Sequence, residues 1–273
     1  MNYDLLFLDV DGTLKQEPHG ISEANKAAIL HACQAGKKIS IASGRNRNLI
    51  LDTVKELQLN HYGASYTVAL NGAHIIDNHT GDTLHTIPID TQLTYLIFLK
   101  SYELDLSCHV CTENYVYFNY NDKHYDWYRK SGCNCRLVDM GNADLGLEEP
   151  PLKILISSQD REKLESFQKQ MQPLTEAGLN AEYSTETSLE YTSVHASKGL
   201  GMEYICKLLG KSSSHAVAAG DGENDISMLR MAGLGVAMQN ALETVKAAAD
   251  TITERTCIED GVNEIIHKYL LVQ

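Results

Sequence analysis

Two aspartates, Asp9 and Asp11, stand one residue apart at the end of the apolar run LLFL, residues 5–8. Four consecutive apolar residues are typical of a strand that is buried on both faces, as in a parallel sheet. Neighbouring carboxylates repel each other and are costly to bury, so we expect a bound cation beside them and one carboxylate free to act as a nucleophile. Gly12 lets the chain turn, so that backbone N–H groups can face an anion.

Other polar residues follow two further apolar segments. Ser43 ends KKISIAS, and Asn224 lies between Asp221 and Asp225 in GDGEND, directly after HAVAAG. Alone, each motif is typical of a turn, a helix cap or an acidic loop. Ligands of open α/β sheets bind at the carboxyl ends of strands, so their occurrence together at successive strand ends favours one oxygen-rich site. Carboxylate and hydroxyl oxygens without a nearby His or Cys suit Mg²⁺.

The first and last thirds of the chain contain the elements that must position these residues. Strands are expected at 5–10, 37–43 and 66–70, with helices between them, the first capped by Ser22 and ended by Gly36. The last third is expected to contain helices over 198–209 and 241–249, strands over 215–220 and 234–238, and a helix opened by GENDISMLRMAG. This alternation predicts a doubly wound parallel sheet with helices on both faces, built from residues 1–82 and 191–273.

The middle of the chain, residues 83–190, differs in composition and pattern. It contains most of the aromatic residues, including the single tryptophan, Trp127. Helices are expected at 91–103 and 160–177, and strands at 104–110, 115–120, 151–158 and within 181–194. We expect an inserted α+β domain with an antiparallel sheet, so the predicted fold is an α/β doubly wound core with an inserted cap.

Composition limits the partners that we expect. The formal net charge of −13 speaks against nucleic acid and anionic membranes, which recruit Lys and Arg. No stretch approaches 18 uncharged apolar residues, and MNYDLLFLDVDG does not resemble a signal peptide, so a cytoplasmic location is expected.

Seven cysteines suit a reducing compartment. Cys108 and Cys111 invite a zinc interpretation, but alternation along a strand puts them on opposite faces, and strand packing is favoured.

At this point a family resemblance becomes specific. DVDGTL, Ser43 in IASGR, Lys198 in SKG and GDGEND resemble the four ordered motifs of the haloacid-dehalogenase-like (HAD) phosphatases. The first and fourth motifs are highly specific, whereas the second and third are short and gain weight from their order. The long insert resembles the large α/β cap of the Cof-type branch, so the match spans the whole chain.

The resemblance implies a role for each matching position. Asp9 would be the nucleophile that forms an aspartyl-phosphate, and Asp11 the general acid and then the general base. Mg²⁺ would be held by the Asp9 carboxylate, the Asp11 backbone carbonyl and Asp221, with Asp225 supporting them. The remaining positions would contact the substrate. The transferring phosphoryl group would be bound by Ser43, Lys198, Asn224 and the backbone amides of Gly12 and Gly44, while Asn71 and Gly72 match a turn that faces the substrate.

One position departs from the family pattern. Many relatives have a Gly-Val or similar pair before Ser/Asn-Lys-Gly, where this chain has His195-Ala196. His195 would either contact the substrate or pack at the domain junction, and the sequence favours packing. Lys198 itself fits the motif.

The predicted activity is Mg²⁺-dependent hydrolysis of a small phosphorylated metabolite, such as a sugar phosphate or a phosphorylated cofactor, by a monomer or homodimer. A phosphosugar mutase or phosphotransferase on the same fold remains open, because the motifs do not distinguish water from a sugar hydroxyl as acceptor. A phosphoaccepting receiver-type module has no acid two residues after its acceptor aspartate, and the presence of Asp11 here argues against it. A ligand-binding protein without catalysis is disfavoured, because all four motifs are complete.

Overall fold

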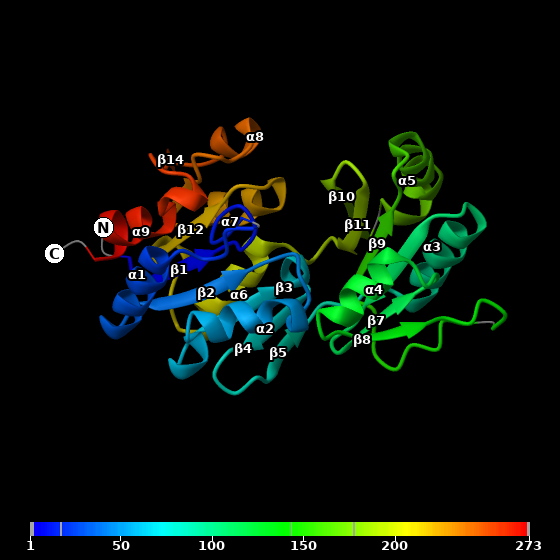
Figure 1. Ribbon diagram of the computed structural model, residues 1–273, viewed down its shortest axis with the longest axis horizontal. Helices are drawn as coiled ribbons and strands as arrows, with labels where there is room; N and C mark the ends of the chain where they lie inside the picture. Colours follow the sequence, from blue (N-terminus) through cyan, green and yellow to red (C-terminus); the bar gives the residue numbers. More distant parts are fainter. Residues whose placement is uncertain (1–2, 17, 143, 177, 272–273) are drawn as a thin grey trace. The chain divides into compact units, whose positions relative to one another are not determined.

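The computed structural model describes residues 3–16, 18–142, 144–176 and 178–271. The chain divides into two compact units (Figure 1). The core unit comprises the segment up to Arg45, Ile50–His85 and the segment from Ser197 onward; the inserted unit comprises Asn46–Leu49 and Thr86–Ala196. The boundaries expected from the sequence, at 82/83 and 190/191, lie a few residues earlier in the chain, and the short segment 46–49 was expected in the core.

The core unit contains a sheet of eight strands in the order β14-β13-β12-β1-β2-β3-β4-β5. The strands are β1 (Leu5–Leu8), β2 (Lys38–Ala42), β3 (Tyr66–Ala69), β4 (His74–Asp77), β5 (Thr83–Thr86), β12 (Ala216–Gly220), β13 (Leu234–Ala237) and β14 (Thr251–Ile252). β1 lies between β2 and β12 and is parallel to both, with Leu5 opposite Lys38 and Ala216. All four residues of β1 are buried, as the uninterrupted apolar run predicted.

The helices of the core unit connect these strands. They are α1 (Glu23–Gln34), α2 (Arg47–Glu56), α6 (Lys198–Leu208), α7 (Ile226–Met231), α8 (Glu243–Lys246) and α9 (Gly261–Ile265), with short helical turns η1 (Leu59–His61), η2 (Leu70–Gly72), η3 (Ser213–His215), η4 (Glu223–Asp225), η5 (Cys257–Glu259) and η6 (Ile266–Leu270). Ser22 caps α1, because its side chain accepts the Asn25 N–H. No helix in the described ranges is long and apolar enough to cross a membrane.

Successive strands are added in opposite directions from the middle of the core sheet. From β1 the chain passes through α1 to β2, toward the β5 edge, whereas from β12 it passes through α7 to β13, toward the β14 edge. Because parallel crossovers are right-handed, α1 and α7 cover opposite faces, which confirms the doubly wound arrangement. α9 packs against α1 (Figure 1), and α6 packs against α7. The direction of winding reverses between β1 and β12, where ligands of such sheets bind.

The inserted unit has its own six-stranded sheet, in the order β10-β11-β9-β6-β7-β8. Its strands are β6 (Ser107–Cys111), β7 (Tyr115–Phe118), β8 (Asn134–Leu137), β9 (Lys153–Ser157), β10 (Leu179–Thr185) and β11 (Ser188–Ser193), and its helices are α3 (Thr91–Glu103), α4 (Lys123–Lys130) and α5 (Arg161–Thr175). The expected sheet was antiparallel throughout. The structure corrects this, because β8 pairs with β7 in parallel after the crossover through α4.

Four strands, β4, β5, β8 and β14, and the length of one helix were not anticipated. β4 and β5 extend the core sheet beyond β3, and β4 is antiparallel to β3. The expected helix over 241–249 is reduced to α8, because Leu242 is extended, with φ −60° and ψ 148°, and its N–H donates to the Asp221 carbonyl. At its other end, Ala248 and Ala249 donate to carbonyls only three residues back, which ends the α-helical pattern.

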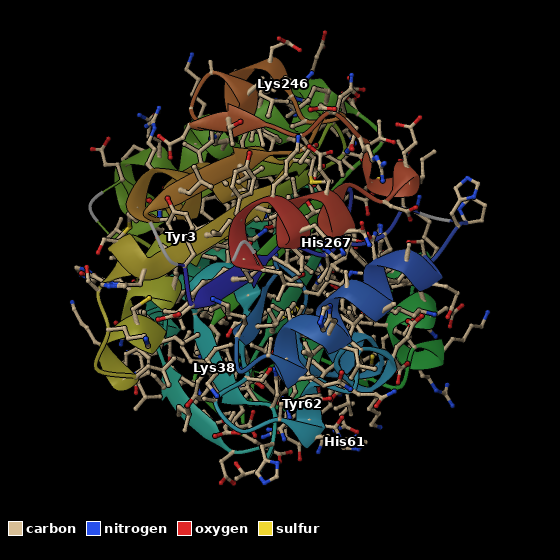
Figure 2. All side chains as sticks on the ribbon, turned by 90° about the vertical axis from the view of Figure 1, so that its left-hand side faces the viewer. Tyr3, Lys38, His61, Tyr62, Lys246 and His267 are labelled. Atoms are coloured by element: carbon tan, nitrogen blue, oxygen red, sulfur yellow. The ribbon has the colours of Figure 1, made fainter. Side chains whose placement is uncertain are left out.

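Different polar residues lie at the amino-terminal and at the carboxyl-terminal ends of the parallel strands in the core sheet. Figure 2 labels Tyr3 and Lys38 at the amino-terminal edge, where Tyr3 precedes β1 and Lys38 begins β2. There Lys211 Nζ lies 2.6 Å from Asp4 Oδ2 and lowers the pKa of this carboxyl. The charged residues of the sequence motifs lie at the opposite, carboxyl-terminal edge.

Candidate active site

Asp9 is the first residue after β1, and it lies beside the end of β12. Its backbone N–H donates to the Ala219 carbonyl at 3.0 Å, which continues the parallel ladder by one bond. The residue is only 6% exposed. A buried carboxylate needs a charged or hydrogen-bonding partner, and two elements far away in the sequence supply the groups around it.

Lys198 is that partner. Its Nζ lies 2.6 Å from Asp9 Oδ1 and 2.6 Å from Asp225 Oδ1, and the side chain is fully buried. Lys198 is the first residue of α6, where Ser197 caps the helix by accepting the Leu200 N–H. The helix start therefore fixes the base of the lysine, and two carboxylates fix its ammonium group.

Asp225 joins the lysine to the turn after β12. Its Oδ2 accepts the backbone N–H groups of Asp221 and Gly222, at 3.0 and 2.9 Å. This carboxylate therefore shapes the GDGEND loop with one oxygen and binds Lys198 with the other. Asp221 then projects from the loop, and its Oδ1 accepts the hydroxyl of Thr13 at 2.8 Å.

Burial and mutual repulsion change the acidities of this cluster. Burial raises the pKa of Asp9 well above its usual value, against the effect of Lys198, and the Asp225 and Asp221 charges raise it further. Burial likewise raises the pKa of Asp221 to about 6, although the Thr13 hydrogen bond opposes the shift. Burial disfavours the ammonium of Lys198, but Asp225 and Asp9 together raise its pKa above the ordinary value.

The donor set fits a hard divalent cation. Asp9, Asp221 and Asp225 each offer a carboxylate oxygen, and these atoms lie within 4.8 Å of one another. Lys198 forms ion pairs with Asp9 and Asp225, so this group of three carboxylates contains one ammonium that contacts two of them. An oxygen-only set of this kind suits Mg²⁺.

Asp11 is oriented differently from Asp9. Its carboxylate is half exposed, and the guanidinium of Arg45 donates to both of its oxygens, Nε to Oδ2 at 2.7 Å and Nη2 to Oδ1 at 2.6 Å. Between the two aspartates the strand ends, as their spacing required. Gly12 then takes a φ of +83°, and a Cβ there would lie 2.1 Å from Asp221 Oδ2. Only glycine lets this backbone approach the Asp221 carboxylate.

A second group of polar residues joins the ends of β2 and β3 to the GDGEND loop. Ser43 is buried; its N–H donates to the Val68 carbonyl, and its own carbonyl accepts the Asn71 N–H at 3.1 Å. Asn71 Oδ1 accepts the side-chain amide of Asn224 at 3.1 Å. Gly44 follows Ser43 directly. The structure therefore joins Ser43 and Asn224, both predicted to bind phosphate, through Asn71, which was predicted to face the substrate, in one hydrogen-bonded chain.

Gly72 and His195 differ in how they relate to this cluster. Gly72 has a φ of +97°, and a Cβ there would lie 2.1 Å from the Ser197 carbonyl, so the turn packs directly against the start of α6. His195 is exposed and belongs to the inserted unit. Its backbone N–H donates to Ser193 Oγ at 3.3 Å. Its packing at the domain junction, which the sequence favoured, stays a prediction.

Sequence reasoning assigned no role to two residues that hold the predicted catalytic groups. Thr13 binds Asp221, and Arg45 binds Asp11. Both stand inside the quoted motifs, DVDGTL and IASGR, so their position next to assigned residues was the available signal. Their partners lie more than thirty residues away, which local pattern does not reveal.

Comparison with known proteins identifies the family. Residues 6–266 match the sequence profile of the haloacid dehalogenase-like hydrolases. The chain belongs to this family. A HAD-like hydrolase structure from Bacteroides thetaiotaomicron superposes with a TM-score of 0.86 at 28% identity and covers 98% of this chain and 99% of the other.

Two of the curated relatives of this HAD-like hydrolase are phosphatases whose names state a substrate. The 5-amino-6-(5-phospho-D-ribitylamino)uracil phosphatase YcsE of Bacillus subtilis is 30% identical over 98% of this chain and 96% of its own length. The pyridoxal phosphate phosphatase YbhA of Escherichia coli is 25% identical over 99% and 100%. The fold and these relatives identify this HAD-like hydrolase as a phosphatase of the Cof-type branch.

Proposed function

We propose that this HAD-like hydrolase is a Mg²⁺-dependent phosphatase of small phosphorylated metabolites, acting through an aspartyl-phosphate on Asp9. The observation that carries the proposal is the buried Asp9 carboxylate, which Lys198 holds at 2.6 Å beside a second and a third carboxylate. The relatives act on a ribityl phosphate and on pyridoxal phosphate, as their names state, and this supports a small phosphomonoester here.

Each residue of the site has its own role in the two steps of the proposed reaction. Asp9 Oδ attacks phosphorus, and the bond from phosphorus to the leaving oxygen breaks. Asp11 gives its proton to that oxygen, then takes a proton from the water that attacks the phosphoaspartate and releases inorganic phosphate. Lys198, Ser43 and Asn224 stabilise the charge on the transferring group. Mg²⁺, held by Asp9, Asp221 and the Asp11 carbonyl with support from Asp225, would neutralise negative charge on the carboxylates and the substrate.

Arg45 gives Asp11 a defined starting position. A bidentate guanidinium fixes both carboxylate oxygens, which is a stronger and more directional contact than one hydrogen bond. We infer that arrival of a phosphate dianion draws Arg45 partly away, which frees one oxygen of Asp11 to carry the proton. The arginine then adds positive charge next to the substrate.

The test is hydrolysis of p-nitrophenyl phosphate at neutral pH, with Mg²⁺ and with EDTA. Wild type is expected to release nitrophenol only with Mg²⁺, and Asp9→Asn to fall to background. Asp52→Asn, an exposed aspartate on α2, is the matched control and should retain full activity. An inactive wild type, or an Asp9→Asn variant as active as wild type, would contradict the proposal.

The same assay separates hydrolysis from phosphoryl transfer. Nitrophenol and inorganic phosphate are measured together, in the presence of a sugar as alternative acceptor. Equal amounts mean that water accepts the phosphoryl group. An excess of nitrophenol over phosphate would identify a phosphotransferase on the same fold.

A further inference from the structure

The loop that follows β13 makes three hydrogen bonds to the loops that carry the catalytic groups. The N–H groups of Met238 and Leu242 donate to the carbonyls of Gly220 and Asp221, at 3.0 and 3.2 Å. The third bond comes from a side chain: Asn240 Nδ2 donates to the Gly12 carbonyl at 2.7 Å. None of the four sequence motifs includes Asn240.

The carboxamide of Asn240 is fixed at both ends. Its Oδ1 accepts the backbone N–H of Cys257 at 2.9 Å, while its Nδ2 binds Gly12. A carbonyl partner on one side and an N–H partner on the other define which end of the amide is nitrogen. Cys257 is itself tied to the same loop, because its thiol donates to Gln16 Oε1 at 3.4 Å.

The carbonyl that Asn240 holds belongs to the turn that begins at Asp11. Gly12 donates its N–H to the Lys15 carbonyl at 2.7 Å, and its φ of +83° brings its backbone against Asp221. Rotation of the peptide after Gly12 would move the Thr13 hydroxyl away from Asp221 and change the direction in which the Asp11 carboxylate points. Glycine has no side chain to resist this rotation, so hydrogen bonds have to restrict it, and Asn240 supplies one of them.

We propose that Asn240 is a positioning residue, which holds the Gly12 carbonyl and thereby keeps the Asp11 carboxylate where it can protonate the leaving oxygen. This inference rests on the proposed function, in which Asp11 is the general acid. The Met238 and Leu242 bonds are made by the backbone and do not require the Asn240 side chain, whereas a variant loses its contacts with Gly12 and Cys257.

The test compares p-nitrophenyl phosphate with phenyl phosphate. Phenol is a much weaker acid than p-nitrophenol, so phenyl phosphate depends more strongly on proton donation to the leaving oxygen. Because kcat/KM includes the step in which this oxygen leaves, Asn240→Ala is expected to lose about tenfold in kcat/KM on phenyl phosphate and at most about threefold on p-nitrophenyl phosphate. Asn240→Asp, which puts an oxygen against the Gly12 carbonyl, should also lose more kcat/KM on phenyl phosphate than on p-nitrophenyl phosphate.

The control is Gln239→Ala, in the same loop. Gln239 is exposed, and its backbone N–H, which donates to Thr253 Oγ1 at 2.8 Å, survives the change. This variant should match wild type on both substrates, and thermal melting should show that all variants are folded. Equal losses of Asn240→Ala on the two substrates, or no loss, would overturn the proposal. Wild type inactive on both esters would instead remove the proposed function, and the role of Asn240 with it.

Discussion

At the residue scale, the site depends on one cation shared between two carboxylates. Lys198 is fully buried between Asp9 and Asp225, and its position follows from the first turn of α6. The positions of Asp9 and Asp225 at strand ends predicted that they meet, and the family resemblance implied that Lys198 joins them. It did not predict that the lysine ammonium contacts the Asp9 carboxylate directly, since side-chain pairing depends on tertiary geometry.

Replacing Lys198 with methionine should therefore remove both activity and stability. Two carboxylates would be left buried without their cation, and breaking a buried pair in this way costs about 3–5 kcal/mol at neutral pH. Hydrolysis of p-nitrophenyl phosphate should fall at least about a hundredfold. Urea unfolding and a rate assay measure the two effects. Lys207→Met, an exposed lysine on the same helix, should change neither.

Thr13 supports the metal site from one side. Its buried hydroxyl binds Asp221 Oδ1, and groups that orient a metal-binding carboxylate typically contribute 10–100-fold in affinity. Thr13→Val keeps the shape and removes this bond, so the Mg²⁺ concentration for half-maximal activity should rise about tenfold.

Thr244→Val is the matched control, because Thr244 makes the same kind of bond to an exposed glutamate, Glu223. Its Mg²⁺ requirement should equal that of wild type. If Thr13→Val has an unchanged Mg²⁺ requirement, Asp221 does not depend on this hydroxyl for its orientation.

At the element scale, patterns predicted the elements with strong signals and missed those with weak ones. α3 runs from Thr91 to Glu103 as expected, and β1 is buried throughout. β5 and β8 are four residues long and contain few apolar side chains, so their pairing is decided by neighbouring strands. The expected helix over 241–249 begins only at Glu243, because Leu242 is extended where its loop binds the Asp221 carbonyl, a tertiary context that overrides local helix preference.

Strand β6 contains a histidine that should make the stability of the inserted unit depend on pH. His109 is 1% exposed, and its Nε2 lies 3.1 Å from the Tyr128 hydroxyl. Burial lowers the pKa of His109 to about 3, with nearby His124 and Lys153 adding to the shift. The unfolded chain then binds more protons than the folded one between about pH 3 and 6.5, so stability should fall as pH falls through this window, by up to about 1.4 kcal/mol per pH unit.

Trp127 provides the measurement, because it is the single tryptophan and lies on α4, in ring contact with Tyr128. Urea unfolding followed by its fluorescence should lose stability between pH 7 and pH 5 in wild type. His109→Gln, whose side chain does not titrate, should show a clearly smaller loss. Equal pH dependence in the two proteins would mean that His109 is protonated as easily in the folded state as in the unfolded one.

At the scale of the whole molecule, the chain builds two separate apolar cores. One surrounds the central strands of the core unit, and the other includes Phe98, Ile154 and Phe167 of the inserted unit. Composition and pattern predicted an insertion at 83–190, because strand–helix alternation stops there and aromatic residues increase. The assignment of 46–49 to the inserted unit was not foreseeable, since it rests on contacts such as that between Asn46 Nδ2 and Cys133 Sγ at 3.6 Å.

This division predicts that residues 86–196 fold on their own. The segment holds a complete six-stranded sheet, with α3 and α5 in contact with each other and their apolar residues in one cluster with those of the sheet. A unit with its own core and continuous sequence has what independent folding requires. Without 46–49 it loses the contacts of Asn46 and Asn48, so it should be less stable than the same unit in the full chain.

We expect a single cooperative urea transition of the fragment in Trp127 fluorescence and far-UV circular dichroism. The double variant Phe98→Ala/Phe167→Ala, which empties the centre of this cluster, is the control that should abolish the transition. A fragment that unfolds without a cooperative transition would show instead that the inserted unit depends on the core unit for its structure.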